Sequence, residues 1–241
     1  MAKPSIVVTG SLGFIGSNLM KELPDTSVGL DIKSGNDILS CHLPEADIVI
    51  HLAAEPGVVK SMKAPLTSAQ TNIIGTIRLL RRYPNAKFIF ASSGGTIQET
   101  IESPYGLTKY VGEEYIKLLH SNYVILRFCN VYGEGSRSVV DKWLNEDELT
   151  IYGDGKTNRI YGHVSDIVRA IVLSTGWPTG TYKLGTGDRF SVNEIAQAIG
   201  KPVTYDSPRA GEITHTRSKL PNETPNWEAK VSLMDYMKDN L

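Results

Sequence analysis

The stretch Ser5-Ile-Val-Val-Thr-Gly10-Ser-Leu-Gly13-Phe-Ile-Gly16 is a short apolar run that ends in a glycine and is followed by two more glycines at three-residue spacing. Ser5 to Thr9 is typical of a buried strand, and Phe14 and Ile15 are the first apolar residues of the helix expected after it. Glycines allow a tight turn, close approach of the backbone to a pyrophosphate, and packing of the helix on the sheet. Unpaired amides and the helix dipole attract negative charge there. Taken alone, the spacing also fits an ordinary glycine-rich turn.

Further apolar runs alternate with amphipathic stretches through the first half of the chain. The runs expected as strands are Val28 to Leu30, Asp47 to Leu52, Lys87 to Ala91 and Val124 to Phe128. Between them, apolar residues three or four positions apart, as at Ile73, Ile77 and Leu80, predict helices. This alternation predicts an α/β fold with a doubly wound parallel sheet, whose ligands lie beyond the carboxyl ends of the strands.

After about Gly133 the sequence becomes rich in turns, as in Tyr152-Gly-Asp-Gly155 and Lys183-Leu-Gly-Thr-Gly187. Short helices are expected at Val164 to Leu173 and Val192 to Ile199. We therefore expect a larger domain over residues 1–133, its core extended by part of 160–175, and a small C-terminal α/β lobe over residues 134–241. No flexible linker separates them, so they should share an interface.

Composition favours small-molecule chemistry. The chain has 241 residues, 41% of them hydrophobic, and a formal net charge of -1, which gives no basic footprint for nucleic acid. No apolar run is long enough to predict a transmembrane helix, and the N-terminus shows no export signal. Cys41 and Cys129 are the only cysteines, too few for a disulfide framework or a thiolate metal site. We therefore expect no metal, no membrane partner and a cytoplasmic protein.

Several residues of the first domain are candidates for binding a dinucleotide. Asp31 follows the second strand, where a carboxylate would bind an adenosine ribose and repel a 2'-phosphate, which favours NAD over NADP. It also fits a strand-ending turn, and Lys33 nearby weakens the argument against phosphate. His51-Leu-Ala-Ala54 places small residues where a flat ring could lie, or where packing is merely tight. Asn72 is expected to bind a cofactor ribose or to cap the helix Ile73 to Arg82.

The reactive groups are expected on the next strand and helix. The strand Lys87 to Ala91 delivers Ser92 and Ser93 at its carboxyl end, and Ser103-Pro104 starts a helix on which Tyr105 and Lys109 share a face. A phenol titrates near about 10, and a neighbouring ammonium and a positively charged nicotinamide would lower that pKa. Tyr105 is the candidate base, Lys109 would hold the nicotinamide ribose, and Ser93 or Ser92 would bind the substrate oxygen. An exposed helical Tyr–Lys pair without function is the alternative.

Four further segments follow in order: HLAAEPGVVKSM at His51 to Met62, TNIIGTIRLL at Thr71 to Leu80, SPYGLTK at Ser103 to Lys109 and LRFCNVYG at Leu126 to Gly133. With the glycine loop, they resemble the extended short-chain dehydrogenase/reductases, in particular the NAD-dependent nucleotide-sugar epimerases and dehydratases, over nearly the whole chain. The resemblance implies a Rossmann domain that binds NAD and a C-terminal lobe that binds a nucleotide sugar, most commonly a UDP-sugar. It also implies the catalytic trio Ser93 (or Ser92), Tyr105 and Lys109.

The residues expected to bind the cofactor are Gly10, Gly13, Phe14, Ile15, Gly16, Asp31, Ile32, Asp37, Ile38, Leu52, Ala53, Ala54, Asn72, Ala91, Ser92, Tyr105, Lys109 and Phe128. By resemblance, the substrate is expected to contact Ser93, Asn130, Arg159 and Arg209, the two guanidiniums binding a diphosphate or its ribose. The resemblance further implies a homodimer that pairs through the helices Ile73 to Arg82 and Tyr105 to His120. A short closing helix is expected from Ser232 onward.

The leading functional hypothesis is a nucleotide-sugar 4-epimerase of the UDP-glucose/UDP-galactose type, acting through a transient 4-keto sugar. A 4,6-dehydratase ranks lower, because relatives of that kind carry an Asp-Glu pair where this chain has Gly94-Gly95. Other oxidoreductases of the family and decarboxylases rank behind them. The non-enzyme alternative is an NAD-binding interaction protein without turnover, as the unusual Gln98-Glu99 would suggest. Short loops between Asp31 and Asp37 and between Gly95 and Ser103 predict an open substrate pocket.

Overall fold

The structure is a computed structural model, and it describes residues 4–94, 101–211 and 224–241. Gly95, Gln98 and Glu99, which bear on the functional alternatives, lie outside the described residues. Within these ranges, none of the helices has the length and apolar character needed to cross a membrane.

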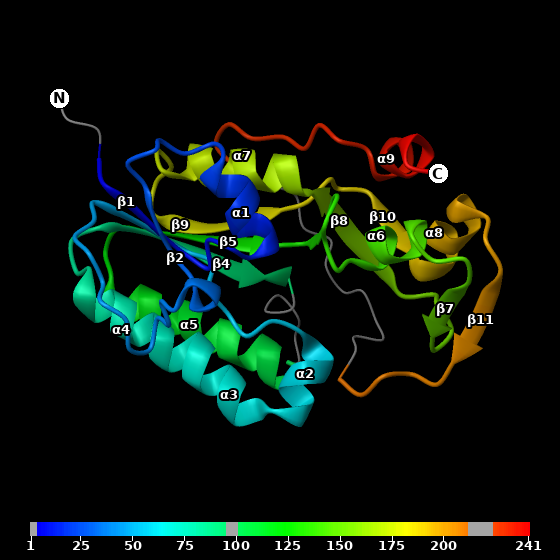
Figure 1. Cartoon of the computed structure of the whole chain (residues 1–241), viewed down its shortest axis with the longest axis horizontal. Coiled ribbons are helices and arrows are strands. Elements are labelled where there is room, and N and C mark those ends of the chain that lie inside the picture. Colours follow the sequence, from blue (N-terminus) through cyan, green and yellow to red (C-terminus); the bar gives the residue numbers. More distant parts are fainter. Residues whose placement is uncertain (1–3, 95–100, 212–223) are drawn as a thin grey trace.

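A six-stranded parallel sheet forms the centre of the molecule, in the order β2-β1-β3-β4-β5-β9 (Figure 1). Its strands are β1 (Ile6–Thr9), β2 (Val28–Leu30), β3 (Ile48–His51), β4 (Lys87–Ser93), β5 (Tyr123–Phe128) and β9 (Gly180–Leu184). The five strands expected from the sequence are all present. The strand order reverses between β1 and β3, so the fold is the predicted doubly wound sheet, with its switch point there.

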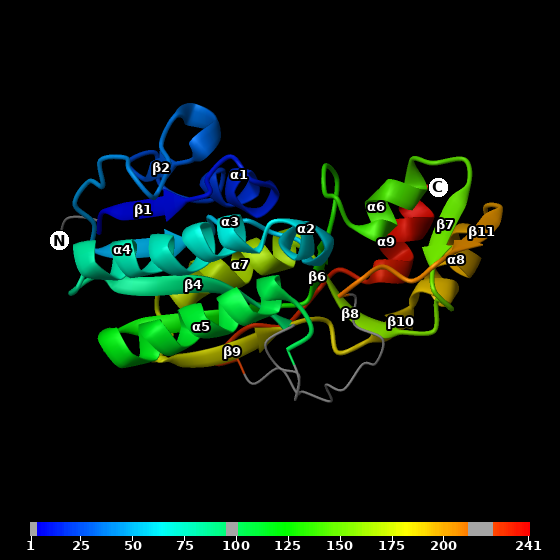
Figure 2. The same ribbon diagram turned by 90° about the horizontal axis from the view of Figure 1, so that it is seen from below.

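Helices cover both faces of this sheet (Figures 1 and 2). On one face, α1 (Phe14–Met20) and α7 (Val164–Ser174) bury Leu19, Ile167 and Ile171 against the strands. On the other face lie α4 (Gly75–Arg82) and α5 (Pro104–Leu119), whose Leu79, Leu80 and Ile116 are buried. Continuous Val/Ile/Leu/Phe runs in the central strands are therefore buried on both sides, as parallel sheets require.

The helices on the second face begin earlier in the chain than the sequence predicts. After α2 (Val58–Lys63), α3 (Pro65–Ala69) continues through a π-helical turn at Gln70–Ile74 directly into α4. Pro65 starts this run, because proline suits the first helical turn. Asn72 therefore lies inside a helical segment and caps no helix. By contrast, α5 begins as expected, with the Ser103 hydroxyl accepting a hydrogen bond from the Gly106 amide at 3.1 Å.

A smaller region lies beyond the carboxyl ends of the strands (Figure 2). Its strands are β6 (Asn130–Tyr132), β7 (Leu149–Tyr152), β8 (Asn158–His163), β10 (Arg189–Ser191) and β11 (Val203–Asp206), and its helices are α6 (Val139–Leu144), α8 (Val192–Ile199) and α9 (Leu233–Asp239). The strands form one three-stranded and one two-stranded sheet. Its own core includes Tyr132, Trp143 and Tyr161. The expected helix after Ser232 is α9, and Ser232 caps it.

The main domain and the smaller region are not separated by the single expected boundary at residue 133. After that boundary, α7 packs on the main sheet and β9 is one of its strands. Trp177 and Trp227 also pack into the core of the main domain. Only Leu184 of β9 is fully buried, so the turn-rich sequence around it gives a weak strand pattern. The pairing of β9 with β5 is a long-range contact, which local periodicity does not show.

Candidate active site

The glycine loop packs directly against the end of β3 at the switch point of the sheet. Gly10 has φ +72°, and a Cβ built on it would lie 2.7 Å from the Ala53 amide nitrogen. A Cβ on Gly16 would lie 2.1 Å from the Gly10 carbonyl oxygen, so the first turn of α1 touches the loop backbone. No side chain caps that turn. A side chain at either glycine would clash with the neighbouring backbone, so both positions need glycine. Such close packing of loop, strand and helix is typical of a loop that binds a dinucleotide pyrophosphate.

A cleft of about 2260 Å³ runs from this loop into the smaller region. It is large enough for a dinucleotide together with a second ligand, since pockets for one drug-sized ligand measure roughly 300–1,000 Å³. All the predicted cofactor residues line it except Asn72, and so do three of the four predicted substrate residues, Asn130, Arg159 and Arg209. Ser93 is the fourth. Its hydroxyl is directed to Tyr105, which does line the cleft.

Asp31 fixes the loop from the end of β2. Its carboxylate accepts hydrogen bonds from the amides of Leu12 and Lys33, both at 2.9 Å, and the Lys33 ammonium donates to the Leu12 carbonyl at 2.9 Å. Asp31 thus forms the expected strand-ending turn, and it also lines the cleft. The glycine cradle and this carboxylate fit NAD.

Asn72 has a third arrangement, different from both expected ones. Its side chain is buried and accepts from the Glu55 amide at 2.7 Å, while its amide group donates to the Glu55 carbonyl at 3.2 Å and to the Thr108 hydroxyl at 3.0 Å. Asn72 therefore ties the loop after β3 to α5. Its contacts hold the wall of the cleft in place from behind.

His51 stabilises the same wall and was not singled out as a functional residue by the sequence. Its ring nitrogens lie 2.8 Å from the Thr9 hydroxyl and 3.0 Å from the Thr76 hydroxyl. Burial lowers the pKa of His51 to about 3, so the ring is neutral. The imidazole is thus a fixed crosslink between the ends of β1 and β3 and the helix α4.

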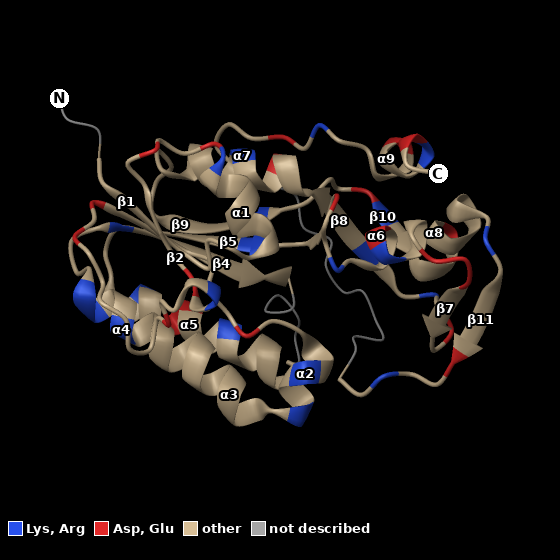
Figure 3. Ribbon diagram, viewed as in Figure 1, with Lys and Arg blue, Asp and Glu red and all other residues tan. Residues whose placement is uncertain are grey.

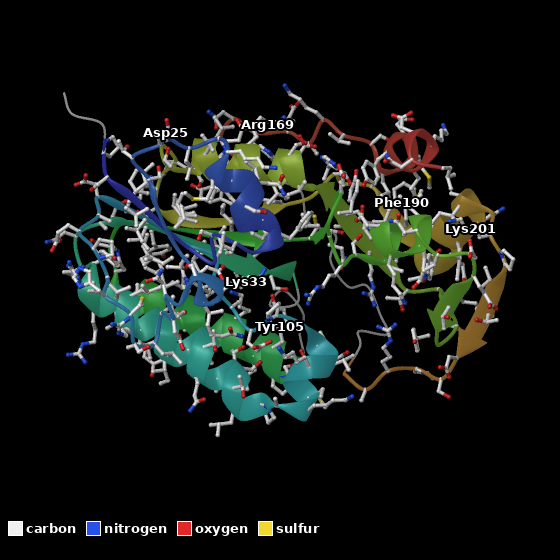
Figure 4. All side chains as sticks on the ribbon, viewed as in Figure 1. Asp25, Lys33, Tyr105, Arg169, Phe190 and Lys201 are labelled. Atoms are coloured by element: carbon white, nitrogen blue, oxygen red, sulfur yellow. The ribbon has the colours of Figure 1, made fainter. Side chains whose placement is uncertain are left out.

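Tyr105 and Lys109 lie near the N-terminal end of α5, beside the end of β4 (Figure 4 labels Tyr105). The Tyr105 amide donates to the Ser61 hydroxyl at 3.1 Å, and the Tyr105 side chain is hydrogen-bonded to the Ser93 hydroxyl. Lys109 is only 3% exposed, and its ammonium lies 4.4 Å from the centre of the Phe90 ring. The predicted trio is therefore brought together, with Ser93 nearest the phenol.

The electrostatics of this pair differ from the sequence-based expectation. Burial raises the pKa of Tyr105, and the hydrogen bond from Ser93 opposes that change. Burial also lowers the pKa of Lys109 to about 7, against the attraction of Glu113. The pKa of Tyr105 is therefore not lowered, contrary to the expectation from its proximity to Lys109. Burial removes water from both groups and so disfavours the charged form of each.

The structure separates the roles of the two adjacent serines. Ser92 is buried, and its hydroxyl donates to a carboxylate oxygen of Glu113 at 2.5 Å. Ser93 contacts the phenol instead. The sequence left this choice open, and the geometry favours Ser93.

The predicted substrate residues lie on the strands and loops of the smaller region. Asn130 begins β6 and donates to the Ile160 carbonyl at 3.1 Å. Arg159 lies on β8, and the Arg209 guanidinium lies 3.5 Å from the centre of the Tyr152 ring. Tyr152, which the sequence analysis placed only in a turn, also lines the cleft. The sequence feature that could have identified Tyr152 is an aromatic residue directly before Gly-Asp-Gly.

Charge around the cleft is mixed. Acidic and basic segments are interspersed over both regions of the ribbon (Figure 3). Across residues 4–94, 101–211 and 224–241, no group of three His, Cys, Asp or Glu side chains is arranged to hold a metal ion. The polar side chains of the site include hydroxyls, a lysine and guanidiniums.

Comparison with known proteins agrees with this architecture. Residues 6–185 match the model of the NAD dependent epimerase/dehydratase family. A putative UDP-glucose 4-epimerase of Methanocaldococcus jannaschii is 31% identical, and the alignment of 292 positions covers 97% of this chain and 96% of that protein. It spans more positions than the 241 residues here, so that relative carries insertions that this chain lacks.

Two solved structures have similar folds. One is the UDP-glucose 4-epimerase of Thermotoga maritima with UDP-glucose, with 29% identity, a TM-score of 0.82, and coverage of 97% of this chain and 96% of that one. The other is the UDP-glucuronic acid 4-epimerase of Bacillus cereus in complex with UDP-glucuronic acid and NAD, with 26% identity, a TM-score of 0.82 and the same coverage. The chain therefore belongs to the NAD-dependent epimerase/dehydratase family of extended short-chain dehydrogenase/reductases, and its cofactor is NAD.

Proposed function

We propose that this protein is a nucleotide-sugar 4-epimerase that interconverts UDP-glucose and UDP-galactose. The observation that carries the proposal is that one cleft joins the glycine loop, the Tyr105–Ser93 hydroxyl pair and the two arginines Arg159 and Arg209. Relatives named as UDP-sugar epimerases, matched along almost their whole length, support the same reaction type.

In this proposal the residues of the chain bind, orient and exchange a proton. The phenol oxygen of Tyr105 takes the proton of the sugar 4-hydroxyl and later returns it, while the Ser93 hydroxyl holds the same oxygen. Lys109, in its ammonium form, orients the cofactor ribose, and the Ser93 hydrogen bond favours the phenolate. NAD, held by the glycine loop and Lys109, would supply a hydride acceptor for C4 of the sugar and the same hydride for its return. Arg159 and Arg209 bind the diphosphate or ribose, which leaves the sugar free to turn over.

A 4,6-dehydratase is the second candidate within the family. It needs an acid to remove water from the sugar, and Gly94 directly follows Ser93. A Cβ built on Gly94 would already lie 3.2 Å from the Phe128 carbonyl oxygen, so this position is closely packed and carries no side chain. This favours the epimerase, because epimerisation at C4 needs no such acid.

The proposal includes a homodimer in the cytoplasm. Large apolar side chains are exposed on α3, on the π-helical turn before α4 and on α5, among them Leu66, Ile74, Leu107, Tyr110 and Leu118. Such a patch on two neighbouring helices favours a symmetric helical interface. Both cysteines, Cys41 and Cys129, are free thiols, which fits a reducing compartment.

The test is conversion of UDP-glucose and UDP-galactose by purified protein, followed by NMR of the sugar. We expect each substrate to yield the same mixture of the two, with NAD unchanged at the end. Deuterium placed at C4 should remain at C4 in the product, because the hydride returns to the carbon it left. A released keto sugar, or loss of deuterium to NADH, would contradict the epimerase. The N-acetyl and uronic forms of both sugars, assayed in parallel, test the choice of sugar.

A further inference from the structure

A fully buried carboxylate lies behind the proposed catalytic residues and has no role in the mechanism above. Glu113 is 0% exposed and follows Lys109 by four residues, hence by about one turn of α5. Its two oxygens accept from the Arg127 guanidinium, at 2.9 Å from Nε and 2.6 Å from Nη2. This two-pronged contact is the geometry in which an arginine holds a carboxylate most rigidly.

The same carboxylate connects three elements. Arg127 comes from β5, Glu113 from α5, and the Ser92 hydroxyl, which donates to Glu113 at 2.5 Å, from the end of β4. Ser92 is joined through one peptide bond to Ser93, the residue hydrogen-bonded to Tyr105. Any movement of Glu113 would therefore shift the strand end that presents Ser93.

Glu113 is also the charge that favours the ammonium form of Lys109. Burial lowers the pKa of Lys109, and the attraction of Glu113 opposes that change. The other groups around Lys109 are the neutral His51 ring from β3, the Phe90 ring from β4 and Tyr105 on its own helix. Lys117 lies farther along the helix, at 3.8 Å from Glu113, and is partly exposed.

We propose that the Glu113–Arg127 pair is a positioning device, which fixes the strand end bearing Ser93 against the helix bearing Tyr105 and Lys109 and places a negative charge opposite the Lys109 ammonium. The inference rests on the proposed roles of these three residues. A merely structural pair would hold β5 to α5 without acting on Lys109. The two possibilities predict different effects of removing the Glu113 charge on the titration midpoint of Lys109.

The experiment follows the titration of Lys109 by NMR of its ε-carbon in lysine-labelled full-length protein, with the resonance assigned through Lys109→Met. Three variants are compared with the unchanged chain. Glu113→Gln removes the carboxylate charge, Glu113→Gln with Arg127→Met removes both buried charges, and Glu114→Gln is the matched control. Glu114 is the next residue on the helix and pairs with Lys117 at 2.7 Å on the outer face.

We expect the titration midpoint of Lys109 to fall by about one pH unit or more in Glu113→Gln, because an opposite charge nearby contributes that much. In the double variant it should fall by less but still measurably, because the loss of the Arg127 charge also removes a repulsion on Lys109. Glu114→Gln should leave the midpoint unchanged. The double variant guards against misfolding of the single one, because exchanging a whole buried ion pair is tolerated better than leaving one charge unpaired. An unchanged midpoint in a folded Glu113 variant, or an equal shift in the Glu114 control, would overturn the proposal.

Turnover gives a second readout. In the Glu113 variants the alkaline limb of the pH profile should move to lower pH, because Lys109 loses its proton earlier as pH rises. At a pH above both midpoints, turnover should then fall about tenfold more than at pH 5, since one pKa unit is a tenfold change in the protonated fraction. The NMR titration needs no sugar, so it remains informative even if the epimerase assay fails.

Discussion

At the scale of single residues, the chemistry of this protein depends on how a few hydroxyl and charged groups are paired. Ser92 and Ser93 are neighbours in the chain, yet one is bonded to a buried carboxylate and the other to the phenol of Tyr105. Lys109 lies under the surface of the cleft, where the loss of hydration has brought its pKa to about 7. Small differences in placement thus separate the groups proposed to react from those that support them.

The first prediction concerns Tyr105. Replacement by phenylalanine removes the proposed proton acceptor but keeps the ring, so we expect turnover to fall by roughly 10²–10⁴-fold, the usual contribution of a positioned acid or base. NAD binding, measured by calorimetry, should change little. Tyr182, whose hydroxyl is bonded to the Pro178 carbonyl at 3.0 Å, provides a matched control. Activity that survives Tyr105→Phe would exclude Tyr105 as the base. A parent protein that binds NAD and turns over none of the UDP-sugars would instead support a binding protein.

The second prediction concerns the pH dependence of stability. In an unfolded chain a lysine titrates near about 10.4, whereas folded Lys109 has a pKa of about 7. Between these values the unfolded state binds the extra proton, so this residue makes the free energy of unfolding rise with pH, by up to about 1.4 kcal/mol per pH unit. The contribution is complete above the unfolded pKa and is lost as pH falls to about 7.

Lys109→Met should remove this rise. Urea unfolding of both proteins at several pH values from 7 to 10 measures the difference between them, in which the contributions of the other titrating groups largely cancel. Parallel stability curves for the two proteins over this range would show that Lys109 titrates normally in the folded state.

At the scale of elements, the cleft is made by backbones that approach each other closely. The glycine loop between β1 and α1 touches the end of β3, and the cap of α5 brings Tyr105 beside β4. Asn72 and His51 fix these joints through hydrogen bonds to Glu55, Thr108, Thr9 and Thr76. The elements are therefore held in one arrangement before any ligand binds.

The third prediction tests the close contact between α1 and the glycine loop. A methyl group introduced by Gly16→Ala would lie 2.1 Å from the Gly10 carbonyl oxygen, so α1 must move away from the loop. We expect a loss of about 1–3 kcal/mol in the free energy of unfolding, typical of overpacking, and weaker NAD binding. Gly176→Ala is the control, because its Cβ would meet the Leu173 carbonyl at an ordinary 3.6 Å. Equal effects of the two changes would mean that the close contact in the loop is unimportant.

At the scale of the whole molecule, the two regions share one cleft and the outer helices leave an apolar face. Leu118 is 80% exposed on α5, and Ile74 is 55% exposed where the π-helical turn meets α4. Exposed side chains of this size are common singly, but a group on adjacent helices favours a partner. A second copy of this chain is the partner we propose.

The fourth prediction follows from this face. Leu118→Asp places a charge within the proposed interface, so we expect the mass in solution to halve, as measured by analytical ultracentrifugation. Tyr205→Asp is the control, because Tyr205 is also well exposed but lies on β11 in the smaller region. A parent protein that sediments as a monomer would refute the homodimer directly.

The sequence by itself determined the α/β class, the five leading strands, the glycine loop and the shared helix face of Tyr105 and Lys109. These features are encoded locally, by apolar periodicity, by glycine spacing and by the i and i+4 relation of Tyr105 and Lys109 on one helix. Most of the residues that the motifs identified line the cleft, because loops at the carboxyl ends of parallel strands must converge.

Only the tertiary structure decided which serine faces the phenol, where Asn72 directs its amide, and that β9 and Trp227 belong to the main core. It also showed that burial raises the pKa of Tyr105, against the expected direction, and lowers the pKa of Lys109, and it placed Glu113 and Arg127 behind them. All of these depend on contacts between residues far apart in the chain and on the exclusion of water, and neither is written in local sequence spacing.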